Sequence, residues 1–159
     1  MSKKFRLVTR SDMDGLVCAV ILKQLELIDE IKFVHPKDMQ DGTIEITEND
    51  IITNLPYVPQ AHLVFDHHES ETVRNEKADN HIIIADAPSA ARVVYDHYAK
   101  DHDLSMIRED MMIAVDKADA AQFSKEDILD PKGWDLLSFL MDSRTGLGRF
   151  RDFRISNYQ

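Results

Sequence analysis

The stretch that decides the fold is residues 5–22, FRLVTRSDMDGLVCAVIL. It begins with a short run of β-prone side chains, Phe5–Thr9, and ends with an apolar segment, Leu16–Leu22, that is long enough for a buried helix. Two aspartates and a glycine lie between these segments: Asp12, Asp14 and Gly15. The stretch therefore predicts a strand, an acidic loop and a helix in direct succession.

Further short runs along the chain favour strands. Ile31–His35 is stopped by Pro36, and turn residues separate the others, which are Ile44–Ile46, Asp50–Asn54, Ala61–Phe65 and His81–Ala85. The last two are largely apolar, as strands are when a parallel sheet is covered on both faces. We therefore expect a sheet whose strands are mostly parallel.

Helices are predicted at Pro88–Tyr98, Asp110–Ala121 and Trp134–Met141, with a loop at Asp127–Gly133 before the last of them. Strands that alternate with helices indicate the α/β class, here a mostly parallel sheet sandwiched by helices. In such sheets ligands bind beyond the carboxyl ends of the strands. The polar residues expected at those ends are Asp12, Asp14, Asn54, Asp66, His67 and His68.

Composition limits the class of protein. The 159 residues, 43% of them hydrophobic, are enough for one core and predict a single domain over residues 1–159. A net charge of −10 argues against binding to long nucleic acid or to an anionic membrane. A polyanionic substrate must therefore bind where positive charge is concentrated locally. A lone cysteine, Cys18, and the lack of an apolar run of roughly 18 residues favour a soluble cytoplasmic protein.

The polar residues at the strand ends suggest a metal site. Carboxylates and imidazoles placed together are costly unless a cation neutralises them. Oxygen and imidazole ligands without thiolates suit Mn²⁺ best, with Mg²⁺ and Co²⁺ as alternatives, and one or two ions. Such an ion lowers the pKa of bound water to roughly 7 and neutralises a phosphoryl oxygen, which favours phosphoester hydrolysis.

Two motifs resemble those of the DHH phosphoesterase superfamily. They are Ser11-Asp12-Met13-Asp14-Gly15, followed by a helix, and Phe65-Asp66-His67-His68, after an apolar strand. A later segment, Val115–Phe123, offers two candidates for the aspartate that the family carries after a helix. Asp119, four residues before Phe123, resembles the spacing in the family's phosphodiesterases, and Asp116 is the alternative. The resemblance implies a Rossmann-like DHH domain and a metal-dependent phosphohydrolase or phosphodiesterase.

The resemblance also implies roles for these residues. Asp12 and Asp14 would each hold a different metal, His67 would ligate one of them, and Asp116 or Asp119 would complete the second site. His68 would contact the scissile phosphate. The implied catalytic residues are Asp14, Asp66, His67 and His68, and the implied metal ligands are Asp12, Asp14, Asn54, Asp66, His67, Asp116 and Asp119.

Two positions depart from the family pattern. Arg10 lies in the stretch where a histidine ligand is usual, and Asn54 stands where a metal-bridging aspartate is usual. These departures predict one ion where relatives hold two, with Arg10 supplying positive charge in place of the other. The combination of Asn54-Leu-Pro-Tyr57 with Gly146–Phe150 is most similar to exopolyphosphatase-like members of the superfamily.

The C-terminal stretch Arg144–Arg154 holds four arginines and two glycines, and it could clamp a phosphate or lead into a further domain. Superfamily members usually continue into a substrate-binding domain of the DHHA1 type, which this chain does not include. The predicted substrate-binding residues are Arg10, His68, Arg144 and Arg149.

Other readings remain open. Taken alone, Asp12 and Asp14 also suit a helix N-terminus, and Asp116 and Asp119 also suit a solvated helix face. The leading hypothesis is a phosphoesterase acting on polyphosphate, a short oligonucleotide or a small nucleotide. The alternatives are a catalytically degraded module that binds phosphate or nucleotide for regulation and, less favoured, a RecJ-like nuclease. The one protein partner that the sequence leaves possible is a second copy of the chain, in a homodimer.

Overall fold

The computed structural model describes residues 4–68, 79–119 and 132–141. Its centre is a parallel sheet of five strands in the order β2-β1-β3-β4-β5. The strands are β1 (Phe5–Arg10), β2 (Ile28–Val34), β3 (Asp50–Thr53), β4 (Leu63–Asp66) and β5 (His81–Ile83). The predicted α/β class is confirmed, and every strand pair in the sheet is parallel.

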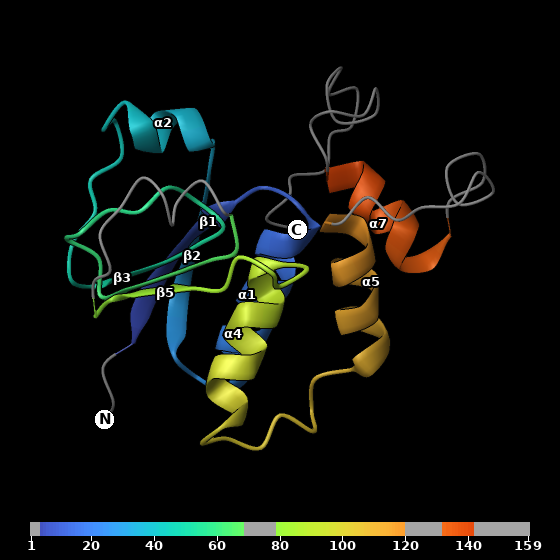
Figure 1. The fold of residues 1–159 in the computed structure, drawn as a ribbon. Coiled ribbons are helices and arrows are strands. Elements are labelled where there is room, and N and C mark those ends of the chain that lie inside the picture. The colour runs from blue at the N-terminus through green and yellow to red at the C-terminus, as the bar shows by residue number, and fades with distance from the viewer. Residues whose placement is uncertain (1–3, 69–78, 120–131, 142–159) are drawn as a thin grey trace.

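Helices cover the two faces of this sheet unequally (Figure 1). One face carries α1 (Met13–Gln24) and α4 (Ala90–Ala99), with α5 (Glu109–Asp119) against both helices and α7 (Gly133–Met141) against α5. The other face carries the short α2 (Pro36–Gln40) and the irregular segments on either side of β3, residues 44–49 and 54–61. Among the described residues, no helix is both long and apolar enough to cross a membrane.

Alternation along the strands divides the apolar side chains between two cores. Leu7, Ile51 and Phe65 face the helical layer, whereas their neighbours Val8 and Ile52 face α2. Consecutive side chains of a strand point to opposite faces, so each strand supplies both cores. Both faces of the sheet are therefore buried, as the apolar runs predicted.

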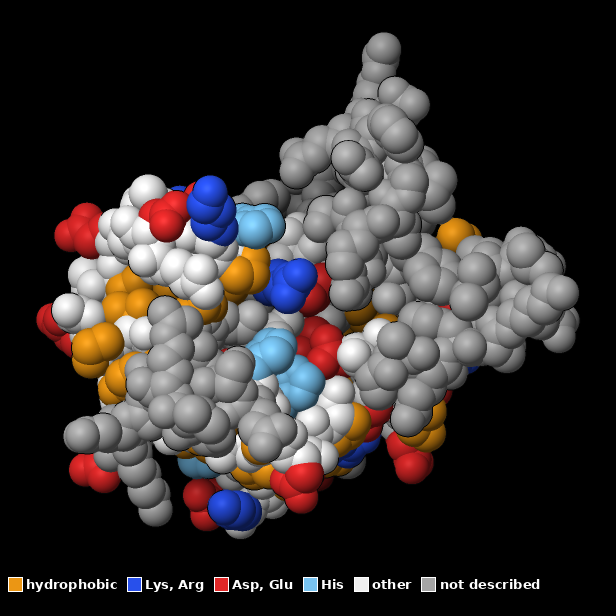
Figure 2. Space-filling model, turned by 45° about the horizontal axis from the view of Figure 1, so that its top comes forward, with side chains coloured by type: hydrophobic (Ala, Val, Ile, Leu, Met, Phe, Trp, Pro, Cys, Tyr) orange, Lys and Arg blue, Asp and Glu red, His pale blue; other side chains and the backbone are white. Residues whose placement is uncertain are grey.

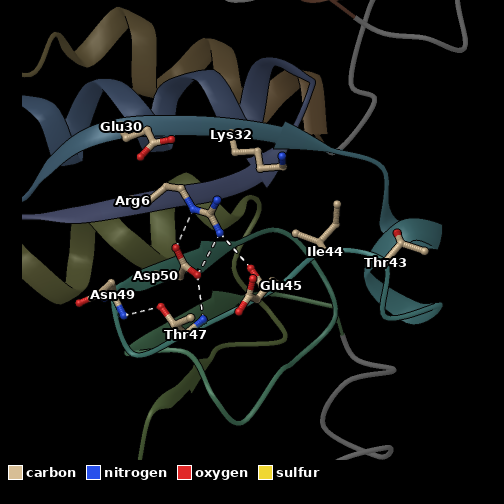
Figure 3. A pocket seen from close by; sticks show the side chains of 9 residues that line it. All are labelled: Arg6, Glu30, Lys32, Thr43, Ile44, Glu45, Thr47, Asn49 and Asp50. Atoms are coloured by element: carbon tan, nitrogen blue, oxygen red, sulfur yellow. Dashed lines mark hydrogen bonds and ion pairs between the residues drawn. The ribbon is translucent and has the colours of Figure 1, made fainter.

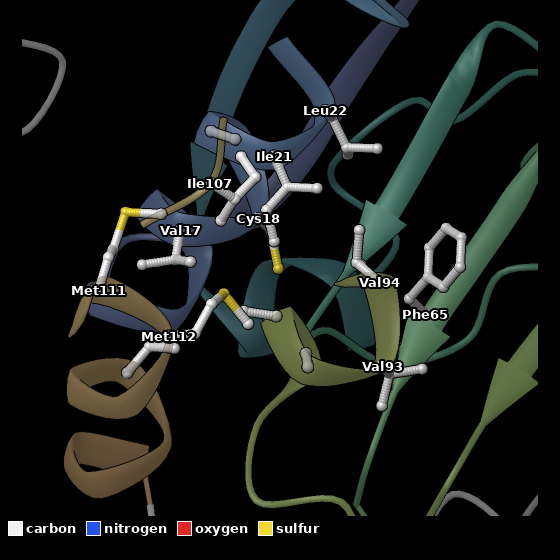
Figure 4. Close-up of a cluster of buried hydrophobic side chains, with 14 of the residues drawn as sticks. Val17, Cys18, Ile21, Leu22, Phe65, Val93, Val94, Ile107, Met111 and Met112 are labelled. Atoms are coloured by element: carbon white, nitrogen blue, oxygen red, sulfur yellow. The ribbon is translucent and has the colours of Figure 1, made fainter. Parts of the chain in front are cut away.

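Helix α1 lies at the middle of the larger core (Figure 4). Val17, Cys18, Ile21 and Leu22 are each fully buried, and α1 contacts α4, α5, β1 and β2. A helix that is apolar on most sides is stable only when it is enclosed in this way. Burial also raises the pKa of the Cys18 thiol, which keeps it protonated and unreactive.

The prediction of a strand at Ile44–Ile46 was wrong, and helix α2 was missed. Pro36 does not merely stop β2, because it occupies the first turn of α2, where a proline is tolerated. The ring of His35 caps that helix by accepting a hydrogen bond from Lys37 N at 3.1 Å. Ile44 and Ile46 pack at the edge of the second core without pairing to a strand. Most of the predicted Asp127–Gly133 loop lies outside the described residues.

The turn from β1 into α1 is tightly packed at Gly15. A Cβ atom at this position would lie 1.9 Å from the carbonyl oxygen of Arg10 and 2.9 Å from Thr9 Oγ1. Thr9 is itself fixed, since its hydroxyl donates to Thr53 O and accepts from Thr53 Oγ1. Only glycine lets the first turn of α1 approach the end of β1 this closely.

Replacing Gly15 with alanine should lower the free energy of unfolding by at least about 2 kcal/mol, because backbone must move to admit the methyl group. Gly42→Ala is the control: Gly42 has a positive φ of 71° but open space around it, so about 1 kcal/mol is expected. Thermal or urea unfolding of both variants measures the difference. An alanine at 15 no more harmful than one at 42 would contradict this account of the turn.

Candidate metal centre

The carboxyl edge of the sheet gathers most of the polar residues singled out in the sequence. Asp12 and Asp14 follow β1, Asn54 follows β3, and Asp66 ends β4 just before His67 and His68. Asp119 reaches the same place from the end of α5. On this face, histidine side chains lie beside acidic and basic ones (Figure 2).

Asp14 is the most deeply placed of these groups, with only 2% of its surface exposed. Its carboxylate oxygens accept hydrogen bonds from Ala90 N at 2.9 Å and Ala91 N at 2.7 Å, the unpaired backbone donors at the start of α4. Burial and the nearby carboxylates of Asp119 and Asp12 raise the pKa of Asp14 well above its usual value, although the two donors oppose this. A cation nearby would relieve that cost.

His67 presents one ring nitrogen to this carboxylate cluster. Its Nδ1 lies 3.0 Å from the carbonyl oxygen of Ala87 and donates to it, which turns Nε2 toward Asp14 and Asp119. Nε2 lies 2.8 Å from Asp119 Oδ2 and 3.9 Å from Asp14 Oδ2. Despite the shorter contact, no well-aligned hydrogen bond links this buried nitrogen to any of the described residues.

The protonation of His67 reflects the surrounding negative charge. Burial by itself lowers the pKa of His67, but the contact with Asp119, the charge of Asp14 and the hydrogen bond to Ala87 together raise it to about 9. Without a metal, the imidazole therefore carries a proton at neutral pH. That proton supplies the positive charge that a bound cation would otherwise bring.

Asp14, His67 and Asp119 offer ligand atoms that all lie within 4.8 Å of one another. Two carboxylate oxygens and an imidazole nitrogen suit Mn²⁺, Mg²⁺ or Zn²⁺, and the carbonyl of Ala87 fixes the ring as second partners of metal-binding histidines do. The Nε2 atom, which faces two carboxylates without an aligned hydrogen bond, and the donor set both fit a divalent ion. We call these three residues the Asp14 cluster.

Asp66 and His68 form a second polar unit beside the Asp14 cluster. Asp66 Oδ1 accepts from His67 N at 2.8 Å and contacts His68 Nδ1 at 2.6 Å. This hydrogen bond is the main cause that raises the pKa of His68. Asp66 is 1% exposed whereas the His68 side chain is 43% exposed, so a buried carboxylate orients an accessible imidazole. The three residues Asp66, His67 and His68 could also hold an ion.

Asp12 is surrounded by donors. It is the N-cap of α1, with Oδ1 accepting from Gly15 N at 2.8 Å. Asn54 Nδ2 lies 3.4 Å and 3.3 Å from its two oxygens, and Arg10 Nε lies 3.5 Å from Oδ2. Asp12 therefore caps α1, as one interpretation of the sequence predicted, and it also lies near the Asp14 cluster.

Asp116 and Asp119, the two alternatives from the sequence, have different partners in the structure. Asp116 accepts from Ser89 Oγ at 2.7 Å and from Arg92 Nη2 at 2.6 Å, and it lies outside the Asp14 cluster. Ser89 caps α4, so this pair fixes the end of α4 that binds Asp14. Sequence reasoning missed Ser89 and Arg92, although a serine directly before an alanine-rich helix is a capping signal. Arg144 and Arg149 lie outside the described residues.

A polar pocket of about 440 Å³ lies elsewhere, over the first part of β1 and β2 (Figure 3). Arg6 binds the carboxylate of Asp50 there, with Nε 2.7 Å from Oδ1. None of the site residues predicted from the sequence lines this pocket. The carboxyl edge, and not this pocket, is therefore the candidate site.

Among known proteins, similarity to this chain is found in solved structures. No family model matches the chain, and no curated protein matches it. An uncharacterized protein from Helicobacter pylori G27 superposes over 87% of this chain and 48% of its own with a TM-score of 0.47 and 14% identity, which is too low to carry meaning. A second structure superposes with a TM-score of 0.82 and is 62% identical over 98% of this chain. This chain spans about half of that protein, 49% of its length, and the protein is PggH, a pGpG-specific phosphodiesterase from Vibrio cholerae.

Proposed function

We propose that this chain is the catalytic DHH-type domain of a metal-dependent phosphodiesterase that hydrolyses short dinucleotides such as pGpG. The observation that carries the proposal is the Asp14 cluster in a chain that is 62% identical to part of PggH. The similarity favours a phosphodiester substrate over the polyphosphate that the exopolyphosphatase-like motifs suggested.

The Asp14 cluster would hold the metal. A divalent ion there, with Mn²⁺ ranked first, would neutralise a phosphoryl oxygen and lower the pKa of a water molecule to roughly 7. Asp14 and Asp119 would supply the negative charge, and His67 would ligate the ion through Nε2 after releasing its proton to solvent. The N-terminus of α4 keeps the Asp14 carboxylate in one orientation through Ala90 N and Ala91 N.

His68 is the residue we assign to the substrate phosphate. Its Nδ1 is held by Asp66, so Nε2 is the nitrogen left to face a ligand, and the raised pKa favours the cationic ring. A cationic, partly exposed imidazole can bind a phosphate oxygen and donate a proton as a leaving oxygen gains charge. Asp66 acts through His68 as a positioning residue.

A small substrate also fits the electrostatics of the chain. With a net charge of −10, long nucleic acid gains little from phosphate contacts, whereas a dinucleotide needs only local positive charge. His68 provides such charge at the carboxyl edge, whereas the charge of Arg10 faces Asp12. The proposed location in the cell is the cytoplasm, where such a substrate would be met.

Purified protein with Mn²⁺ should convert pGpG to GMP, because hydrolysis of its single internucleotide phosphodiester gives two molecules of GMP. Asp14→Asn and His67→Ala should lower the rate by at least about a hundredfold, since each removes a metal ligand. The measurement is chromatographic separation of pGpG and GMP, with and without EDTA. His62→Ala is the control, because His62 stacks on Phe5, far from the Asp14 cluster in the fold.

Polyphosphate and a longer oligonucleotide serve as comparison substrates in the same assay. Faster release of phosphate from polyphosphate than of GMP from pGpG would contradict the dinucleotide assignment. Tight binding of pGpG without turnover in any metal would contradict catalysis and favour the regulatory module.

Asp119→Asn and Asp116→Asn should have different effects, although the two aspartates lie three residues apart on α5. Asp119→Asn should weaken Mn²⁺ binding by at least about tenfold and leave the fold intact, because Asp119 belongs to the Asp14 cluster. Asp116→Asn should cost about 1 to 2 kcal/mol of stability through the weakened contacts with Arg92 and Ser89. Calorimetric titration and thermal unfolding measure the two effects, and a reversal between the variants would refute the assignment.

A further inference from the structure

We infer that the site holds one divalent ion, bound by Asp14, His67 and Asp119, and that Asn54 and Arg10 take the place of a second ion beside Asp12. The inference rests on the proposed function and defines the metal content of the same site. It departs from the two-ion arrangement that the resemblance to DHH phosphoesterases implies.

The first support is the way Asn54 meets Asp12. An ionised carboxylate only accepts hydrogen bonds, so the side-chain amide of Asn54 must present its NH₂ group to it. Nδ2 lies 3.3 Å and 3.4 Å from the two carboxylate oxygens, and Asn54 is 3% exposed. The amide is thus buried against Asp12, with its NH₂ group within reach of both carboxylate oxygens.

The second support is the balance of charge. Arg10 Nε lies 3.5 Å from Asp12 Oδ2, so Asp12 already faces a permanent cation. Among the described residues, neither Asp14 nor Asp119 pairs with a lysine or an arginine, and their ionic contact is with His67. The negative charge of the Asp14 cluster is therefore available to a metal ion, whereas protein groups compensate the charge of Asp12.

Backbone geometry alone does not explain the side chain at position 54. Asn54 has a positive φ of 59°, a conformation that asparagine tolerates better than most residues. Its backbone N donates to Phe65 O at 3.0 Å, which already fixes the turn. Aspartate and glycine are also tolerated at such a φ, so the contact with Asp12 is a property of the amide.

An aspartate at position 54 would place a second negative charge beside Asp12. Its oxygen in place of Nδ2 would lie about 3.3 Å from Asp12 Oδ2, near the roughly 3 Å that separates neighbouring oxygens around an octahedral ion with bonds of about 2.1 Å. Two carboxylates at that distance repel each other unless a cation lies between them. Asn54→Asp should therefore create the second ion site that the natural residue blocks.

The test is to count Mn²⁺ ions per chain on the full chain, by native mass spectrometry and by the electron paramagnetic resonance of the bound metal. The wild type should bind one ion with the hyperfine pattern of an isolated Mn²⁺. Asn54→Asp should bind two ions, with the broadened signal of an exchange-coupled pair. Asn49→Asp, which adds the same charge at an exposed position on the far end of β3, should still bind one.

Two ions with a coupled signal in the wild type would overturn the inference and leave the proposed function standing. A single ion both in Asn54→Asp and in the double variant Arg10→Ala/Asn54→Asp would overturn it as well, because the amide and Arg10 would then not be what excludes the second ion. If Asn54→Asp does not fold, the wild-type resonance signal alone decides between one ion and two. No bound ion in the wild type would overturn both this inference and the metal dependence of the proposed function.

Discussion

The buried carboxylate of Asp14 at the N-terminus of α4 is the interaction on which the carboxyl edge depends. It ties the first turn of α1, which follows β1, to a helix that begins about 75 residues later, through hydrogen bonds from Ala90 N and Ala91 N. A buried carboxylate is costly without such donors, and a helix N-terminus offers donors together with a favourable dipole. The position of α4 relative to the sheet and the orientation of Asp14 are thus set by the same contact.

The same arrangement also brings like charges close together at the carboxyl edge of the sheet. Burial and the carboxylates of Asp119 and Asp12 raise the pKa of Asp14, and in the metal-free protein a proton on His67 relieves part of this cost. Burial prevents water from screening these charges, so the conflict is strongest at Asp14. Perturbed groups of this kind are common at functional sites, and here they surround a nitrogen with no aligned partner among the described residues. A divalent cation resolves the conflict more completely than a proton does.

Much of this arrangement could be predicted from the sequence, because apolar runs that end in polar residues mark the carboxyl ends of buried strands. Phe5–Thr9 and Ala61–Phe65 are runs of this kind, and they are enough to place Asp14 and His67 at one edge of a parallel sheet. The spacing to Phe123 favoured Asp119 over Asp116 only by resemblance, since the choice depends on how α5 packs against α4. The backbone donors of Ala90 and Ala91 have no side-chain signature, and the contact of Asn54 with Asp12 joins residues 42 positions apart. Such long-range contacts can be identified only from the three-dimensional structure.

The central claim is that a divalent ion belongs between Asp14, His67 and Asp119. Anomalous diffraction at the manganese absorption edge, from crystals of the protein grown with Mn²⁺, tests it most directly because it locates the ion without assumptions about activity. The account predicts a peak within bonding distance of His67 Nε2 and of one oxygen each from Asp14 and Asp119. A peak bonded instead to Asp12 or Asp66 without His67 Nε2, or no peak at the carboxyl edge of the sheet, would contradict it.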